Sequence, residues 1–253
     1  MDRVEVRIPE SNLRILNVST SDFIQNLSSV QERYFNSSDR EKVFRFLKEE
    51  DRRRATGSIV LQKDYILKHL LGETTVGETT EQNNCFQNIK ITYSKYGKPG
   101  FGSLTYNVSH DHDLVVLAWL DCSDPADSTL SAGPTDPTSA ELRIGVDIMK
   151  RRPVLIETFA DCLTKTEKNQ IERTPHLFFD HWCSKEALTK AFGLGLGIDF
   201  RKIEYDANDR KIVYDSKTYS VVCFDHCVQN DASERYVCAI VVVESSSADH
   251  RIV

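Results

Sequence analysis

The pattern of hydrophobic and polar residues predicts two halves with the same order of elements. In the first half it indicates a strand, two short helices, a long amphipathic helix and two strands, near residues 14–18, 21–27, 40–49, 52–71, 88–93 and 106–119. In the second half it indicates a strand, two helical segments, a long helix and four strands, near residues 143–149, 153–162, 165–173, 176–192, 200–205, 211–214, 218–224 and 235–243. The chain is therefore expected to be an α+β protein.

Each long helix is followed by a glycine, the residue that most often ends a helix. Gly72 and Gly193 are 193 − 72 = 121 positions apart, close to half of the 253 residues. We therefore expect a pseudodimer of two similar α/β halves, residues 1–122 and 142–253. Each is expected to be a small, mainly antiparallel sheet packed on a long helix, with the active site between the halves. Residues 123–141 are rich in Ser, Thr, Asp and Pro and are expected to be a linker.

Composition narrows the class of protein. The formal net charge of −6 argues against a nucleic-acid partner, because such proteins usually carry a basic face. The longest apolar runs, residues 114–120 and 237–243, are too short for a membrane span, and the charged residues 1–7 are not expected to form a signal peptide. Seven cysteines without the spacing of a disulfide framework fit a reducing compartment. We expect a cytoplasmic protein with no membrane partner.

The long second-half helix carries a group of polar residues at helical spacing. Trp182, Glu186 and Lys190 are expected on one face together with Thr189 and Gly193, opposite a buried stripe of Leu188, Ala191 and Phe192. Asp147 lies near the end of a buried strand, where side chains emerge from a sheet. Two carboxylates beside lysines suit a divalent cation that bridges phosphate oxygens. Without further context, ordinary surface acids and a solvated ion pair explain the same residues.

The two halves differ at these positions. A shift of 121 positions places Tyr65 opposite Glu186, and the first-half strand has Val18 where the second-half strand has Asp147. The first half is therefore expected to lack the metal-binding carboxylates. The simplest arrangement is a single site with carboxylates from the second half and phosphate-binding cations from the first.

Four motifs in a fixed order resemble those of the 4′-phosphopantetheinyl transferases. They are Tyr96-Gly-Lys98-Pro, Tyr106-Asn-Val-Ser-His110, Gly145-Val-Asp147, and the run Trp182-Cys-Ser-Lys-Glu-Ala-Leu-Thr-Lys-Ala191. The segment Ile-Gly-Val-Asp-Ile-Met-Lys, residues 144–150, is most similar to the corresponding segment of the stand-alone eukaryotic type. That type includes the aminoadipate-semialdehyde dehydrogenase transferase of animals and the fungal lysine-pathway enzyme. The resemblance implies the same pseudodimer fold over nearly the whole chain.

The resemblance also implies an activity. Such an enzyme transfers the phosphopantetheine arm of coenzyme A to a serine of an apo carrier domain, with Mg²⁺, and releases adenosine 3′,5′-bisphosphate. Its acceptors are acyl, peptidyl or aminoadipate-reductase carrier domains, the last in lysine biosynthesis, and it is expected to be a monomer. An alternative is a catalytically inactive scaffold that binds coenzyme A or a carrier protein. Another phosphoryl-transfer reaction is disfavoured, because the glycine run from Gly193 to Gly197 follows a helix instead of opening one.

The family motifs suggest roles for individual residues. Asp147 and Glu186 would bind Mg²⁺, and either Glu186 or a metal-bound water would be the base. Lys185 and Lys190 would orient or neutralise the phosphates. Further contacts to coenzyme A are expected from Lys98, Asn107, Ser109 and His110. A local turn and an exposed loop lysine are the alternatives for these four residues.

The sequence allows more than one interpretation for two further features, the basic residue that meets the 3′-phosphate and the third metal ligand. A basic residue between Lys42 and Arg54 is expected to meet the 3′-phosphate, with Lys42 as the candidate, although a solvated basic face explains the cluster Arg52-Arg53-Arg54 equally well. Many bacterial relatives have a third carboxylate where this chain has Met149, and a thioether is a poor ligand for Mg²⁺. Asp111 either completes the metal shell or caps a turn.

Overall fold

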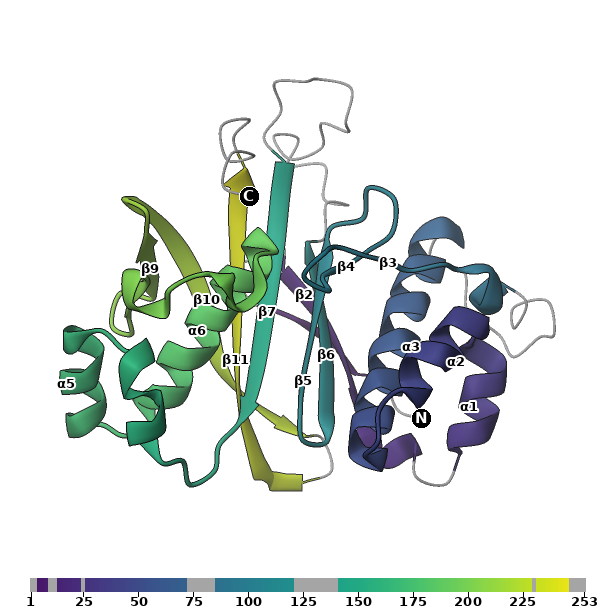
Figure 1. Cartoon of the computed structure of the whole chain (residues 1–253), viewed down its shortest axis with the longest axis horizontal. Coiled ribbons are helices and arrows are strands. Elements are labelled where there is room, and N and C mark those ends of the chain that lie inside the picture. Colours follow the sequence, from purple (N-terminus) through teal and green to yellow (C-terminus); the bar gives the residue numbers. More distant parts are fainter. Residues whose placement is uncertain are drawn as a thin grey trace. The chain divides into compact units, whose positions relative to one another are not determined.

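A computed structural model describes residues 4–8, 13–23, 26–71, 85–120, 141–228 and 231–245. The chain forms two compact units. The first comprises Met1–Val6, Ile15–Leu104 and Val108–Leu117, and the second comprises Arg7–Arg14, Thr105–Asn107 and Ala118–Val253. The mixture of helices and sheets agrees with the predicted α+β class (Figure 1). Gly72 and all of the expected linker except Glu141 lie outside the described residues.

Three helices lie together in the first unit. They are α1 (Leu27–Tyr34), α2 (Ser37–Phe44) and the long α3 (Glu49–Leu71), and both α1 and α2 pack on α3 (Figure 1). A helix was expected at residues 21–27, but the described residues of that range form the 3-10 turn η1 (Thr20–Phe23), and α1 begins at Leu27. Helix α2 starts three residues earlier than expected because Asn36 and Asp39 form a capping box, with bonds of 2.9 and 3.0 Å.

A four-stranded sheet has the order β1-β2-β6-β5. Its strands are β1 (Val4–Arg7), β2 (Leu13–Ser19), β5 (Tyr106–Asp111) and β6 (Leu114–Leu120). The single strand expected at residues 106–119 is instead a hairpin, in which His112 takes a positive φ of 47°. Asp113 stabilises this turn by accepting bonds from the Thr20 hydroxyl at 3.0 Å and the Thr20 amide at 2.8 Å.

The remaining first-unit strands form a small hairpin. Strand β3 (Thr92–Tyr93) pairs antiparallel with β4 (Pro99–Gly100), which confirms the predicted turn around Lys98. Gly97, with φ 82°, closes the turn. The strand expected at residues 88–93 is shorter than predicted, because residues 85–88 form a helical turn.

The second unit contains a five-stranded antiparallel sheet with the order β7-β11-β10-β9-β8. Its strands are β7 (Glu141–Lys150), β8 (Glu204–Asp206), β9 (Lys211–Tyr214), β10 (Lys217–Val228) and β11 (Asp231–Ser245). Each was expected, but β10 and β11 are several residues longer than their apolar cores. Residues 200–202 form a 3-10 turn, η5 (Phe200–Lys202), where the start of a strand was expected.

Helices of the second unit lie on this sheet. Helix α5 (Lys165–Arg173) begins with a capping box between Thr164 and Glu167, and the 3-10 helix η3 (Ile156–Cys162) precedes it. Helix α6 (Leu177–Phe192) packs against β7 and β11 (Figure 1). It ends at Gly193, whose φ of 72° is the left-handed conformation that glycine adopts most easily. The predicted helix end is therefore confirmed.

A buried lysine anchors the long helix of each unit. In the first unit, Lys63 of α3 donates to Asp39 at 2.6 Å and to the Tyr34 carbonyl at 2.7 Å. In the second, Lys185 of α6 donates to Glu167 at 2.5 Å and to the Cys162 carbonyl at 3.0 Å. In both cases the acid is the third residue after a helix cap, and the carbonyl lies two residues before that cap.

The two anchors give a different offset between the two units from the one that the glycines gave. Lys185 and Lys63 are 185 − 63 = 122 positions apart, one more than the spacing of the glycines. With this offset Asp64, and not Tyr65, corresponds to Glu186. The first unit therefore has an acid at this helix position, where the Asp64 carboxylate accepts a bond from the Tyr34 hydroxyl at 3.0 Å.

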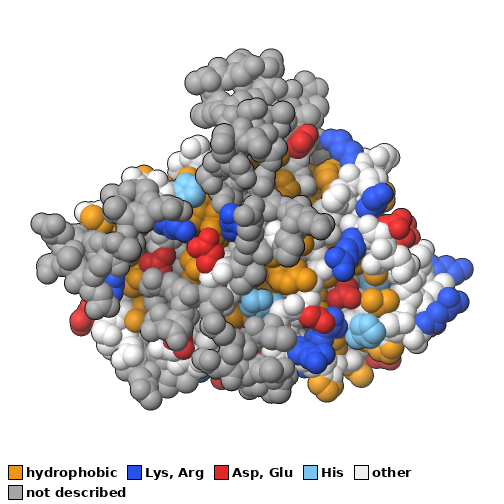
Figure 2. Space-filling model, turned by 180° about the vertical axis from the view of Figure 1, so that it is seen from behind, with side chains coloured by type: hydrophobic (Ala, Val, Ile, Leu, Met, Phe, Trp, Pro, Cys, Tyr) orange, Lys and Arg blue, Asp and Glu red, His pale blue; other side chains and the backbone are white. Residues whose placement is uncertain are grey.

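Two further observations concern the described part of the chain. None of its helices combines the length and the apolar character needed to cross a bilayer. Five of its cysteines have free thiols, namely Cys85, Cys162, Cys183, Cys223 and Cys238. On the face seen in Figure 2, Lys and Arg side chains are interspersed with Asp and Glu side chains, and hydrophobic side chains are exposed between them.

Candidate functional site

The candidate site of the second unit is built on the contact between β7 and α6. Gly145, Asp147 and Met149 alternate with residues that face away, so they share one side of the strand. A Cβ atom at Gly145 would lie 1.9 Å from the Ala187 carbonyl oxygen and 2.4 Å from the Ala191 amide nitrogen. The strand can approach the helix this closely only because residue 145 has no side chain. This approach brings Asp147 to the helix.

Asp147 forms an ion pair with Lys190 of α6. The Lys190 Nζ lies 2.6 Å from Asp147 Oδ1, and the Asp147 side chain is 11% exposed. Glu186 lies one helical turn before Lys190. Burial raises the pKa of Glu186, the charge of Asp147 raises it further, and Lys190 partly opposes both effects. The structure thus brings together three of the predicted residues, two carboxylates and one ammonium group.

The donor set fits Mg²⁺. Asp147 and Glu186 supply hard oxygen donors from facing elements, close enough for one charge to shift the pKa of the other group. A cation, the Lys190 ammonium, already contacts Asp147. No group of three or more His, Cys, Asp or Glu side chains suited to a metal was found among the residues that the structure describes. Two carboxylates agree with the preference of Mg²⁺ for few protein ligands plus phosphate and water.

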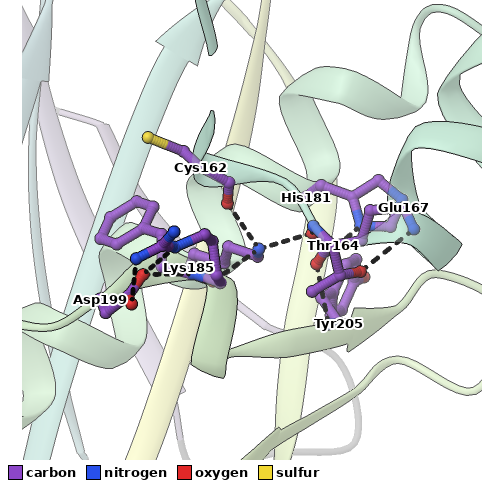
Figure 3. A network of polar contacts seen from close by, with 9 residues as sticks. Cys162, Thr164, Glu167, His181, Lys185, Asp199 and Tyr205 are labelled. Atoms are coloured by element: carbon purple, nitrogen blue, oxygen red, sulfur yellow. Dashed lines mark hydrogen bonds and ion pairs between the residues drawn. The ribbon is translucent and has the colours of Figure 1, made fainter. Parts of the chain in front are cut away.

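Lys185 differs from the expectation that it contacts phosphates. Its side chain is fully buried and makes a salt bridge with Glu167, although it immediately precedes Glu186 (Figure 3). Burial lowers the pKa of Lys185, while Glu167 raises it through charge and hydrogen bonding. Removing one member of such a buried ion pair typically lowers the free energy of unfolding by about 3–5 kcal/mol.

Fewer residues of α6 are available to bind a ligand than the sequence predicted. Trp182 belongs to an aromatic cluster, with its ring centroid 4.7 Å from that of Phe159 and 5.3 Å from that of Phe200. Thr189 is fully buried and donates to the Glu186 carbonyl at 2.9 Å. Because α6 packs on the sheet, on η3 and on α5 at once, most of its surface is interior. Glu186 and Lys190 remain partly exposed.

In the first unit, Lys42 of α2 lies over the ring of Tyr93. Its Nζ is 3.2 Å from the ring centroid, a cation–π contact that sequence spacing could not reveal. Burial lowers the pKa of Lys42 to about 8, although nearby Asp39 raises it. Lys98 lies in the neighbouring β3–β4 hairpin, where its amide donates to the Ser94 hydroxyl at 3.1 Å.

The residues of β5 that were expected to bind coenzyme A lie on both faces of the strand. Asn107 and Ser109 are buried, with exposed fractions of 3% and 4%, whereas His110 between Ser109 and Asp111 is exposed. Asn107 Oδ1 accepts the Val146 N–H at 3.0 Å and so supports β7 beside Asp147. Of these residues, His110 and the partly exposed Asp111 have side chains open to solvent. Asp111 also contacts His112 at 3.2 Å.

The basic cluster does not begin helix α3 as expected. Glu49, Glu50 and Asp51 form the first turn, which places negative charge at the positive end of the helix dipole. Arg54 lies in the following turn and bonds to Asp51 at 2.5 Å and to the His112 carbonyl at 3.2 Å. This arginine therefore ties α3 to the β5–β6 turn.

The part of the chain that carries this candidate site matches a known family. Residues 143–241, which include Asp147 and all of α6, match the family model of the 4′-phosphopantetheinyl transferase superfamily. The matched part begins in β7 and ends in β11.

Curated relatives have related names. A 4′-phosphopantetheinyl transferase, pptA, of Paxillus involutus is 30% identical over 131 residues, covering 45% of each chain. The L-aminoadipate-semialdehyde dehydrogenase-phosphopantetheinyl transferase of Schizosaccharomyces pombe is 28% identical over 178 residues, 63% of this chain and 59% of the relative. The protein of that name in Mus musculus is 26% identical over 144 residues, 49% and 40% respectively.

The chain thus spans between 40% and 59% of the length of these three relatives. The predicted resemblance to the stand-alone eukaryotic type is confirmed: residues 143–241 match the model of the 4′-phosphopantetheinyl transferase superfamily, and the relatives carry the corresponding names.

Proposed function

We propose that this chain transfers the 4′-phosphopantetheine arm of coenzyme A to a serine of apo carrier domains. The observation that carries the proposal is the convergence of Asp147, Glu186 and Lys190 within the part that matches the family. Adenosine 3′,5′-bisphosphate is the other product. A carrier domain that serves aminoadipate reduction is the acceptor class that the relatives' names favour.

The proposed residues divide the work of the reaction. The carrier serine hydroxyl attacks the β-phosphorus of coenzyme A, and the bond from that phosphorus to the bridging oxygen breaks. Glu186 accepts the hydroxyl proton. Lys190 neutralises charge on the leaving phosphate. Mg²⁺, held by Asp147 and Glu186, supplies charge neutralisation on the pyrophosphate when bound.

First-unit residues are assigned to coenzyme A as part of the same proposal. Lys42, Lys98 and His110 are partly or fully exposed and supply the positive charge or donors that phosphates need. We retain Asp111 as a further ligand of the metal shell. We also retain the prediction that the two halves are repeats sharing one active site, and the matching lysine anchors support the repeat.

Intact-mass analysis tests the activity. Purified chain, coenzyme A and Mg²⁺ are incubated with apo carrier domains of acyl, peptidyl and aminoadipate-reductase type. A gain of one phosphopantetheine group on wild-type carrier, absent from a carrier whose acceptor serine is alanine, supports the proposal. Binding of coenzyme A without a mass gain on any carrier would favour the inactive scaffold instead.

The Michaelis constant for coenzyme A is expected to rise as pH increases through about 8. Lys42, whose pKa is lowered to about 8 by burial, loses its charge there and attracts the 3′-phosphate less strongly. The measurement is a pH series of this constant from pH 6.5 to about 9.5. Lys42→Arg is expected to flatten the rise, since a guanidinium stays charged over this range.

Dephospho-coenzyme A, which lacks the 3′-phosphate, provides the control and is expected to show no such rise. The same titration has a consequence for folding. Because the pKa of Lys42 is lower in the folded state, the unfolded chain binds more protons between pH 8 and 10.5, so this residue's contribution to stability grows with pH in that window. An equal pH dependence for both substrates would remove Lys42 from the 3′-phosphate site.

A further inference from the structure

We propose that Lys185 is a positioning residue that fixes the rotation of α6, so that Glu186 and Lys190 face Asp147. The inference rests on the proposed function, because it assigns Lys185 a part in that reaction without contact to substrate. It replaces the expectation that Lys185 binds the phosphates of coenzyme A.

All hydrogen-bonding capacity of the Lys185 ammonium is used inside the second unit. Its three N–H groups have three acceptors, which are Glu167 Oε2 at 2.5 Å and the carbonyl oxygens of Cys162 and Phe200, each at 3.0 Å (Figure 3). The side chain has no exposed surface. A phosphate could be bound only by breaking this network.

Glu167 connects the anchor to the rest of the unit. Its Oε2 also accepts the Thr164 amide at 2.8 Å, and its Oε1 accepts the Tyr205 amide at 3.1 Å. The His181 Nδ1 lies 3.7 Å from Oε1. Burial raises the pKa of the Glu167 carboxyl, but the neighbouring His181 and Lys185 together hold that pKa below its usual value. Lys185 therefore ties α6 to the start of α5, to β8 and to the turn at Phe200.

The geometry of the α-helix explains how the Lys185 anchor affects the site. Consecutive side chains of an α-helix are about 100° apart around its axis. Lys185 points into the polar network, whereas Glu186, the next residue, lies on a different side of the helix and is partly exposed. Lys190, one turn after Glu186, contacts Asp147 at 2.6 Å. A rotation that released Lys185 would carry Glu186 and Lys190 away from the strand.

The first unit provides an independent observation. Lys63 makes the corresponding contacts to Asp39 and to the Tyr34 carbonyl, and it too has no exposed surface. No transfer residue is proposed on α3. The lysine at this position can therefore be explained without a bound phosphate. In both units the buried lysine holds the long helix in place.

Four variants test the proposal, namely Lys185→Met, Glu167→Gln, the double variant of these two, and Lys63→Met as the matched control. Rates are measured at a temperature where circular dichroism shows every variant folded. We expect Lys185→Met to lower kcat about tenfold or more, as loss of a supporting contact often does, with the KM for coenzyme A nearly unchanged. The double variant regains part of kcat and of the melting temperature, because no buried charge is left unpaired. Lys63→Met lowers the melting temperature and keeps kcat.

Mn²⁺ titration of the same variants, without coenzyme A or carrier, gives a readout that does not depend on transfer. Lys185→Met is expected to weaken Mn²⁺ binding severalfold, whereas Lys63→Met leaves it unchanged. A raised KM for coenzyme A with normal kcat, or Mn²⁺ affinity equal to wild type, would overturn the positioning role. If wild type modifies no carrier, the proposed function fails, and the Mn²⁺ comparison still decides whether Lys185 positions the carboxylates.

Discussion

Asp147→Asn and Glu186→Gln are each expected to reduce phosphopantetheine transfer by at least about 100-fold while the chain stays folded. Both substitutions keep the size of the side chain and remove the negative charge. Asp147 would lose its ion pair with Lys190 at 2.6 Å, and Glu186 would lose its capacity to accept a proton. The measurement is the initial rate of carrier modification by intact mass, with a melting curve for each variant.

A matched control separates this effect from a general loss of surface charge. Glu172 is an exposed acid on α5, and Glu172→Gln is expected to leave the rate within about twofold of wild type, as for most surface substitutions. If either site variant modifies a carrier at nearly the wild-type rate, the assignment of Asp147 or Glu186 to the reaction is wrong.

Gly145→Ala is expected to reduce both stability and transfer. The added methyl group would lie 1.9 Å from the Ala187 carbonyl oxygen, and this atom belongs to helix backbone that cannot simply rotate away. Overpacking of this kind destabilises a fold by about 1–3 kcal/mol or more. If β7 moves away from α6 by about 1 Å, the misplaced carboxylate lowers kcat by about 100-fold. Chemical denaturation and carrier-modification assays measure the two effects.

Gly197→Ala is the comparison for this prediction, since no atom lies within 4 Å of a Cβ at that position. It is expected to change the free energy of unfolding little and to keep the transfer rate. A Gly145→Ala variant as stable as Gly197→Ala would mean that β7 and α6 do not need their close contact.

Sequence periodicity predicted most elements of the second unit because their apolar runs match their burial. Helix α5 was predicted with its observed bounds, and the end of α6 at Gly193 followed from glycine's freedom at positive φ. The first unit was less predictable where turns depend on distant partners. The β5–β6 hairpin turns at His112, and its stabilising contact joins Asp113 to Thr20, 93 residues earlier.

The candidate site, too, could be predicted from the sequence only in part. Asp147, Glu186 and Lys190 could be grouped from their motifs, and the structure brings them together. Lys185 belongs to the same motif, yet its side chain points to the interior, because a one-residue step turns a helical side chain by about 100°. A buried lysine and a phosphate-binding lysine look alike in sequence. The difference lies in Glu167, whose position beside Lys185 depends on the packing of α5 against α6.

The paired anchors also bear on how such a chain could have arisen. Lys63 with Asp39 and Lys185 with Glu167 are what the duplication of one ancestral unit would leave in both copies. Selection for a stable fold would keep the ion pair in each copy, because a buried charge without its partner destabilises the unit. If the reaction needs a strand carboxylate in one copy alone, the other copy is free to lose its carboxylate while it keeps the Lys63 anchor. After such a duplication, the likeness of the two units is expected to persist longest in the buried ion pairs and to fade first at positions that only the reaction requires.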